Sequence, residues 1–433
     1  MTKPTDKVKE NRESSSGKTN ISRRDLLKMA GIGGAGLLLG GAGIGALMKS
    51  KDGGSVFASS SPADGYHEAI PFYGDHQAGV TTPAQDFVVF ASFDLTAASV
   101  DEVRKLFQDW TAASAIMAQG GMIGDDNDNL NVPPSDTGEA AGLQPSKTTL
   151  TFGVGPSFFD SRYGLADRKP AELAELPSFG GDALRPEWVG GDIGVQACAN
   201  DMQVAFRAIR NLARIARGKA TLRWTQEGFQ RTSGSDPQGG TARNLMGFKD
   251  GTGNPDVNDA AKMNEVVWTQ SGDGPSWMAG GSYMVVRRIR IRVEVWDRST
   301  LGDQEATFGR HRASGAPLSG KDEFDKIDLE RKDEKGKPAI PMNAHIRVAR
   351  EDNVQILRRS YSYSSGLDTR TGQLDAGLLF IAYNRNVAKQ FIPMQRRLAQ
   401  SDALNEYIEH NGSALFACFP GVKEGGYIGD TLF

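Results

Sequence analysis

Residues 87–110 read FVVFASFDLTAASVDEVRKLFQDW, and the change of pattern inside this stretch decides the fold. The first seven residues, Phe87 to Phe93, have the length and the aromatic and β-branched content of a strand. Ser99 stands three residues before Glu102, which is the capping-box pattern that begins a helix. The following apolar residues recur at helical spacing, namely Val100, Val103, Leu106, Phe107 and Trp110. The stretch therefore predicts a strand followed directly by an amphipathic helix.

The rest of the first half continues this alternation of strands and helices. Strands are predicted over residues 148–154, 193–198 and 221–224. An amphipathic helix is predicted over residues 202–217, and Gly218 ends it. The resulting order, β-α-β-β-α-β, is that of a ferredoxin-like domain.

The second half has a similar order of elements after the glycine-rich run 247–253. We expect strands over residues 283–295, 377–383 and 413–419, a helix after the first strand, a solvated charged loop over 321–337, and a mostly helical segment over 387–407 that breaks near Pro393. The fold class predicted is thus α+β with antiparallel sheets rather than a parallel doubly wound sheet. We place two ferredoxin-like domains at residues 59–240 and 241–433.

The first 58 residues have the pattern of an export signal. A polar start leads to the paired arginines Arg23 and Arg24, and then to an apolar stretch, Met29 to Met48, with eight glycines and no charge. A paired arginine before a weakly apolar stretch is typical of the twin-arginine route, which exports folded proteins. The small residues around Ala58 predict cleavage there. The alternative is a retained membrane anchor, since the stretch is long enough to span a bilayer.

Composition narrows the classes of function. The leader is basic, so the rest of the chain carries a net charge of about −8 within a total of −3. An acidic domain argues against a nucleic-acid partner, which would require a basic face. The two cysteines, Cys198 and Cys418, lie in apolar strand-like runs and are expected to be buried free thiols. No Cys/His spacing predicts a zinc site.

Exported folded proteins often carry a cofactor, and haem iron most often takes an axial histidine. The chain has five histidines: His67, His76, His311, His345 and His410. Polar, loop-like surroundings predict that His67, His311 and His410 face solvent, and His76 is expected to be structural. His345 stands between two other notable segments: the glycine run 247–254, and residues 357–363, which hold Arg358. The glycine run lacks the GxGxxG order, so a nucleotide site is disfavoured.

Together these segments resemble the dye-decolourising (DyP-type) haem peroxidase family. The resemblance covers nearly all of residues 66–433. It rests on a GxxDG motif, a histidine segment, a downstream arginine and three shorter matches: Gly247–Gly251, Asn343–Arg347, Arg358, Asp75–Gly79, Gly309–Arg310 with Gly315–Leu318, and Gly377–Phe380. With the leader, the chain is most similar to the exported, EfeB-like branch associated with iron uptake. The resemblance implies one haem b, held mainly by the C-terminal half.

The resemblance also assigns the site residues. It makes His345 the axial iron ligand and places Asp250 and Arg358 on the opposite, distal face. It implies haem contacts for Gly251, Thr252, Gly253, Arg350, Glu351, Asp352 and Arg358. Asn254 either positions a distal water or is only a turn residue before Pro255. Asp402 is a candidate hydrogen-bond partner of His345.

Chemistry is consistent with that placement. Cleaving hydrogen peroxide requires a base that moves a proton between the two oxygens and a cation that stabilises the departing charge. Asp250 and Arg358 supply these groups, and we expect the activity to be highest at acidic pH. Gly251 and Gly253 would let the backbone approach the porphyrin closely.

The expected function is a peroxidase that oxidises dyes, phenolics or Fe(II) outside the cytoplasm: in the periplasm, in the medium or on the outer membrane face. Its expected partners are the twin-arginine translocase during export, iron-permease components and a second copy of the chain. One competing hypothesis is a deferrochelatase, which releases iron and leaves the porphyrin intact. Two more are a non-enzymatic haem carrier, which would not need Asp250 and Arg358, and a binding protein without haem.

Overall fold

The computed structural model describes residues 64–125, 129–236 and 238–433, which belong to one compact unit. The predicted export signal, residues 1–58, lies outside the described residues. A short helix, α2 (Asp64–His67), precedes the first strand. The predicted domain boundary near residue 240 stays a prediction.

The first half forms the predicted strand and helix order. Its elements are β1 (Phe87–Leu95), α3 (Val100–Ala118), β2 (Thr149–Val154), β3 (Ile193–Ala199), α4 (Met202–Ile215) and β4 (Ala220–Phe229). The Ser99 side chain accepts a hydrogen bond from the backbone N–H of Glu102, so the predicted cap begins α3. Gly218 follows α4 with φ +78°, a conformation that favours glycine.

The second half contains five strands and five helices within the described residues. They are α5 (Ala260–Val266), β5 (Ser282–Ile291), α6 (Val293–Trp296), α7 (Leu301–Phe308), α8 (His345–Arg350), β6 (Leu357–Arg358), β7 (Tyr361–Asp368), β8 (Gln373–Asn384), α9 (Phe391–Ser401) and β9 (Ile408–Cys418). Short 3₁₀ turns are η1 (Pro156–Phe159), η2 (Ala166–Arg168), η3 (Pro186–Trp188), η4 (Ser233–Ser235), η5 (Ser276–Met278) and η6 (Ala403–Glu406).

All the strands join one antiparallel sheet that closes on itself. The order is β5-β9-β2-β3-β1-β4-β7-β8-β6, and a further pairing of β5 with β8 completes the ring. Each half alone has the ferredoxin-like order, β2-β3-β1-β4 in the first and β9-β5-β8-β7 in the second. The pairs β2–β9 and β4–β7 join the halves. The predicted α+β class with antiparallel sheets of the α+β barrel type is confirmed.

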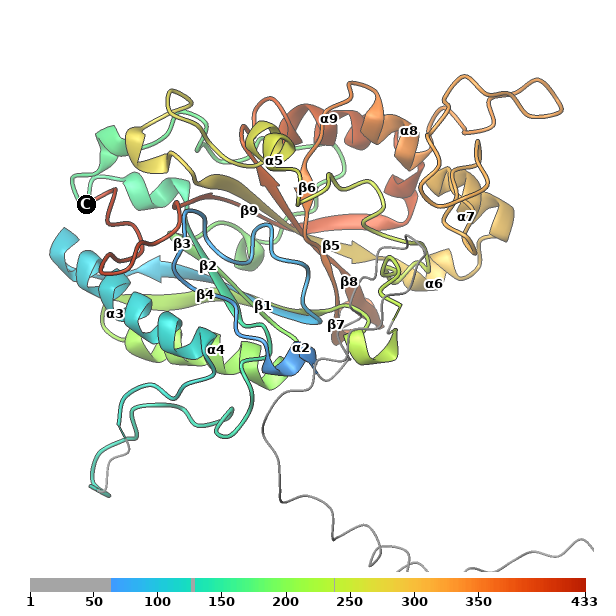
Figure 1. Ribbon diagram of the computed structural model, residues 1–433. Helices are drawn as coiled ribbons and strands as arrows, with labels where there is room; N and C mark the ends of the chain where they lie inside the picture. The colour runs from blue at the N-terminus through green and yellow to red at the C-terminus, as the bar shows by residue number, and fades with distance from the viewer. Residues whose placement is uncertain (1–63, 126–128, 237) are drawn as a thin grey trace, which may run out of the picture. The chain divides into compact units, whose positions relative to one another are not determined.

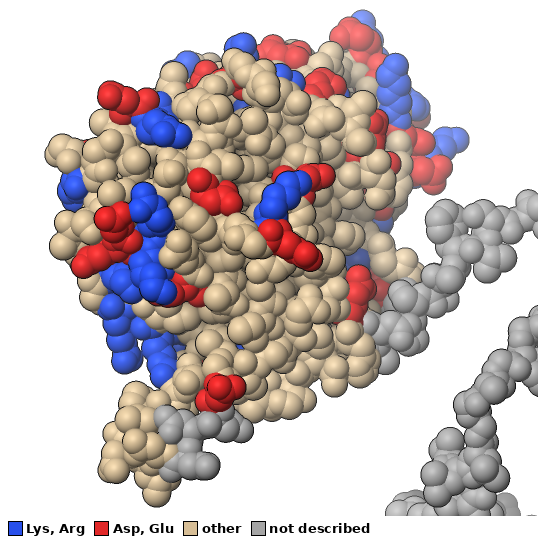
Figure 2. Space-filling view, turned by 60° about the vertical axis from the view of Figure 1, so that its left-hand side comes forward, with Lys and Arg blue, Asp and Glu red and all other residues tan. Residues whose placement is uncertain are grey.

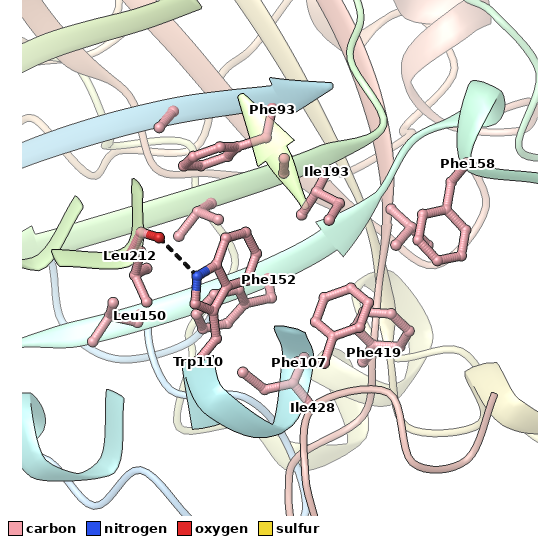
Figure 3. Close-up of a cluster of buried hydrophobic side chains, with 14 of the residues drawn as sticks. Phe93, Phe107, Trp110, Leu150, Phe152, Phe158, Ile193, Leu212, Phe419 and Ile428 are labelled. Atoms are coloured by element: carbon pink, nitrogen blue, oxygen red, sulfur yellow. Dashed lines mark hydrogen bonds between the residues drawn. The ribbon is translucent and has the colours of Figure 1, made fainter. Parts of the chain in front are cut away.

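Helices cover the outside of this barrel. Figure 1 shows α3 and α4 side by side against the first-half strands, and α8 beside α9 over the second half. A cluster of aromatic side chains fills the space between α3 and the sheet, as Figure 3 shows for Phe93, Phe107, Trp110 and Phe152. The Trp110 indole N–H donates to the backbone carbonyl of Leu212 at 2.9 Å, which ties α3 to α4. The only polar atom of this large side chain is therefore satisfied.

Three details of the sequence prediction need correction. His410 was expected to face solvent, but it lies in β9 and is buried, because β9 runs from residue 408 rather than 413. Pro393 does not break a helix: α9 begins at Phe391, and a proline is tolerated in the first turn, where the backbone N–H has no helical partner. The strands β6 and β7 were not predicted. Cys198 and Cys418 are buried free thiols, as expected.

The surface is of mixed charge where Figure 2 shows it, with basic and acidic side chains beside one another and broad areas of other residues between them. No face dominated by Lys and Arg appears in that view. Within the described ranges, every helix is too short or too polar to cross a membrane.

Candidate active site

A cavity of about 490 Å³ lies in the second half of the chain. Its floor is the sheet, to which alternate residues of β5, β8 and β9 contribute: Arg287, Ile289, Ile291, Leu378, Phe380, Ile408 and His410. Residues of α8, α9 and the glycine run form the other walls. Because side chains in a strand alternate between faces, every second residue of these strands reaches the cavity.

His345 enters the cavity from the first position of α8. Its Nδ1 atom lies 2.6 Å from Oδ2 of Asp402, which is buried. Asp402, the candidate named from the sequence, is thus confirmed as the hydrogen-bond partner of His345. No hydrogen bond within the described residues involves Nε2 of His345, so that nitrogen is available to an iron atom in the cavity.

Asp250 and Arg358 meet in the same cavity, although 108 residues separate them in the chain. Nη1 of Arg358 donates to Oδ1 of Asp250 at 2.7 Å. Arg358 projects from β6, which pairs with β8, and the backbone N–H of Asp250 donates to the carbonyl of Ala242. A carboxylate and a permanent cation are therefore held in contact at the cavity wall.

Asn254 has a role that neither interpretation of the sequence included. Its Nδ2 donates to the carbonyl oxygen of Arg358 at 2.7 Å, and its Oδ1 accepts from the backbone N–H of Arg358 at 3.1 Å. Both ends of the amide are thus used to fix the backbone that carries the arginine. Asn254 lines a neighbouring cavity, which also reaches Asp250 and Arg358.

The glycines after Asp250 bring backbone to the cavity wall. Gly251 has φ +129°, which side-chain-bearing residues rarely adopt, and a Cβ on Gly253 would lie 3.2 Å from Nη2 of Arg350. Thr252 also lines the cavity and donates from Oγ1 to Glu323 at 2.9 Å.

Three arginines converge near these glycines: Arg310, Arg350 and Arg358. Burial, followed by the charge of Arg358, lowers the pKa of Arg350. Burial and the charge of Arg350 likewise lower the pKa of Arg310. Such mutual repulsion favours an anionic group between the side chains.

Glu351 and Asp352 are not brought to the cavity, although Arg350 is. Helix α8 ends at Arg350, and both acidic side chains that follow are exposed. Asp352 pairs with Arg397 of α9 instead.

Several lining residues were missed by sequence reasoning. Arg287, Arg310, Phe380 and His410 stand in the wall beside the predicted residues. The sequence shows that Arg287, Ile289 and Ile291 lie on one face of a strand. It does not show whether that face is turned toward a cavity or toward the packed core, so these residues could not be assigned to the site.

The lining fits a haem group. The cavity combines an apolar sheet floor, an imidazole backed by a carboxylate, and the convergent cations Arg310, Arg350 and Arg358, which match the carboxylates of a porphyrin. Within the described ranges, no group of three or more His, Cys, Asp or Glu side chains is arranged to hold a bare metal ion.

Comparison with known proteins agrees with this site. Residues 77–230 match the N-terminal domain of the Dyp-type peroxidases, and residues 241–423 match their C-terminal domain. The chain belongs to the Dyp-type peroxidase family. It is 39% identical to the deferrochelatase of Escherichia coli (strain K12) over 420 residues, which cover 95% of this chain and 96% of that protein.

Solved structures of Dyp-type peroxidases have the same fold. One from Streptomyces coelicolor has a TM-score of 0.79 at 38% identity and covers 87% of this chain and 98% of its own. Ferric DtpA from Streptomyces lividans has a TM-score of 0.80 at 38% identity, with 87% and 99% covered. As a member of this family, the chain is a haem peroxidase, an enzyme that consumes hydrogen peroxide and an electron donor.

Proposed function

We propose that Asp250 and Arg358 are the groups that cleave hydrogen peroxide in this peroxidase. The observation that carries the assignment is their direct contact inside the cavity that His345 also enters. Haem bound there supplies redox-active iron, with His345 as its protein ligand.

Each residue has a defined task in this proposal. The carboxylate of Asp250 accepts a proton from one oxygen of hydrogen peroxide and returns it to the other, so that water leaves. Arg358 stays protonated and stabilises the negative charge that develops on the departing oxygen. Asn254 is a positioning residue, because both of its hydrogen bonds go to the backbone of Arg358.

The test compares Asp250→Asn and Arg358→Leu with the wild-type enzyme loaded with haem. We expect kcat/KM for hydrogen peroxide to fall by at least about 100-fold in each, since a positioned proton-transfer group contributes 10²–10⁴-fold. Haem content, measured from the Soret band, stays unchanged in Asp250→Asn, and the rates of both variants are expressed per bound haem. Asp256→Asn is the matched control, because this exposed carboxylate stands six residues away in the same segment. Unaltered turnover in the Asp250→Asn variant contradicts the assignment, whereas a Soret band without turnover in the wild type favours a haem carrier.

A second activity, release of iron from haem, is proposed on the similarity to deferrochelatases at 39% identity over nearly the full length. In that reaction iron leaves and two protons take its place on the pyrrole nitrogens. Porphyrin fluorescence that rises while the ring absorbance is conserved is the expected result. Bleaching of the ring without fluorescence would show that only oxidation occurs.

We further propose that the chain is exported by the twin-arginine route, and that Fe(II) is its physiological electron donor, for delivery to iron-permease components. The paired arginines before a weakly apolar stretch support the export route. The mature enzyme should then appear outside the cytoplasm with its haem already in place. Peroxide-dependent oxidation of Fe(II), compared with a dye under the same conditions, tests the choice of donor.

A further inference from the structure

One corner of the cavity contains a buried arginine and a buried histidine to which the peroxidase reaction assigns no role. Arg287 in β5 is 1% exposed, and His410 in β9 is 7% exposed. Both line the cavity, and their strands are neighbours in the sheet. We call these two residues the Arg287–His410 corner.

The corner offers two unused hydrogen-bond donors. Arg287 pairs with Asp182 and donates from Nη1 to Oγ of Ser413 at 3.1 Å, but its buried Nε atom has no partner. The ring of His410 has no hydrogen bond to any described residue. Burial and then the charge of Arg287 lower the pKa of His410 to about 3, so the ring is neutral and carries one N–H.

Unpaired donors in an enclosed site are costly unless a ligand satisfies them. A buried polar group without a hydrogen bond costs about 1–3 kcal/mol in protein mutational data. Asp182 holds the arginine in place, and the guanidinium also packs on the ring of Phe179 at 5.3 Å. Arg287 is therefore fixed beside the cavity, while its Nε and the ring of His410 have no acceptor among the described residues.

His410 lies away from Arg358 in the sheet. Arg358 pairs with Ala382 of β8, whereas His410 pairs with Ile289 of β5, which in turn pairs with Leu378 of β8. His410 is thus three strands across and four residues along from Arg358. At about 4.8 Å between strands and about 3.3 Å per residue, the separation is roughly 15–20 Å on a curved sheet.

Two aromatic residues, Phe380 and Phe391, line the cavity near the corner, and Phe179 packs behind them. The ring of Phe391 lies 5.9 Å from the ring of Phe380 and 6.1 Å from that of Phe179. The guanidinium of Arg287 packs on Phe179. A flat apolar body with an oxygen acceptor at one end matches both the rings and the unused donors.

We propose that the Arg287–His410 corner binds a carboxylate attached to an aromatic ring system, and that Nε of Arg287 and the ring N–H of His410 donate to it. The carboxylate comes either from a free aromatic acid or from the haem itself. The proposal is independent of the catalytic roles of Asp250 and Arg358.

The experiment uses two substitutions and a matched control. His410→Leu removes one donor and leaves the Arg287–Asp182 pair intact. The double variant Arg287→Met/Asp182→Asn removes the other donor together with the charge that it balances, because a single substitution would leave a buried charge unpaired. His311→Leu is the control, since His311 lies outside the cavity and pairs with Glu305.

The first arm titrates benzoate into the haem-loaded proteins by calorimetry. The second arm titrates haem-free proteins with haemin and with haemin dimethyl ester, which lacks free carboxylates, and follows the Soret band. For a free acid, benzoate binds about tenfold more weakly to His410→Leu than to the wild type. If the corner binds a haem carboxylate, the wild type binds haemin more tightly than the dimethyl ester, and the ratio of the two affinities falls about tenfold in His410→Leu.

The outcomes of the two arms are distinct. A loss in the first arm supports a free acid, and a loss in the second supports the haem carboxylate. The double variant is expected to show the same loss, and His311→Leu is expected to match the wild type. The proposal is wrong if His410→Leu equals the wild type in both arms. His410→Leu is sufficient for this decision when the double variant does not fold.

Discussion

The two carboxylate oxygens of Asp402 have different partners, and together they determine how His345 is presented. Oδ2 accepts from Nδ1 of His345, while Oδ1 accepts from the backbone N–H of Leu404 at 2.9 Å. The second bond caps η6 and fixes the carboxylate. A proton on Nδ1 would leave the lone pair on Nε2 for the iron, and the negative charge behind the ring would make His345, the proposed ligand, more basic.

This arrangement predicts the effect of Asp402→Asn. Removing the charge weakens the basicity of His345, so we expect the rate of reaction with hydrogen peroxide to fall by about 10- to 100-fold. The reduction potential of the bound haem should become more positive, because the ligand no longer stabilises the oxidised iron as well. Stopped-flow rates and a redox titration measure the two effects. Asp402→Glu retains the charge and should show smaller changes; equal changes in both variants contradict the electrostatic explanation.

At the residue scale, the sequence identified residues whose chemistry is rare and whose motif is distinctive. Asp250, His345 and Arg358 meet at one cavity, as the resemblance implied. Arg287 and His410 were not found, because burial of a polar side chain depends on which strand covers it, and that is settled by pairing distant in the chain. Glu351 and Asp352 show the converse: two neighbours of a lining residue that fall beyond the end of its helix.

At the scale of elements, a buried ion pair joins α4 to the long connection between α3 and β2. Arg207 of α4 donates from Nε to Oδ1 of Asp136 at 3.0 Å, and both side chains are buried. Asp136 also accepts from the backbone N–H groups of Ile123 and Gly138. Burial raises the pKa of Asp136, but these hydrogen bonds lower it more, so the pKa lies well below its usual value.

The expected result of Asp136→Asn is a loss of about 3–5 kcal/mol in the free energy of unfolding at pH 7, because Arg207 becomes an unpaired buried charge. A carboxyl whose pKa is depressed by folding stabilises the fold above its unfolded pKa, near 4, and loses that contribution as the pH falls further. The gap between wild type and variant should therefore be widest near neutrality and narrow below about pH 4. Denaturant unfolding across pH 3–7 measures it, and a gap independent of pH would count against the pair.

Close contact of two strands beneath the cavity gives a further prediction. A Cβ on Gly377 of β8 would lie 1.9 Å from the carbonyl oxygen of Ile289 in β5, so Gly377→Ala must push the strands apart. We expect Tm to fall by at least about 2 °C, the shift that corresponds to roughly 1 kcal/mol in a protein of this size. Gly274→Ala is the control, because nothing lies within 4 Å of its added Cβ. Similar Tm values for both variants would show that the strands tolerate the separation.

Prediction of the elements succeeded where a local pattern was strong. Capping by Ser99 and the apolar spacing through Trp110 are local signals, and β1 and α3 follow them. The strands β6 and β7 pair with β8 in one register, which is interrupted at Arg359 and Ser360. Short polar strands of this kind have little hydrophobic periodicity, so they could not be predicted from the sequence. The pairs that join the two halves, β2–β9 and β4–β7, are long-range and have no local signal.

At the scale of the whole molecule, the arginine pair in the basic leader provides a test of the proposed export route. Replacing Arg23 and Arg24 together with lysine keeps the charge but removes the paired arginines. We expect the protein to accumulate inside the cell with its haem bound, because the translocase reads the arginine pair itself. Cell fractionation followed by a peroxidase assay on each fraction measures the shift. Undiminished export of the double variant would exclude the twin-arginine route.

The place of β9 in the sheet dictates when this protein becomes able to fold. It follows every other described strand in the chain, yet it lies between β5 and β2 and supplies part of the cavity floor. Residues beyond it reach back to α3, where the backbone N–H of Ile428 donates to Thr111. A nascent chain that has not yet reached residue 418 lacks part of this strand, so neither the barrel nor the haem cavity is complete before that point. The cavity can therefore hold haem only after this strand has been made and has paired.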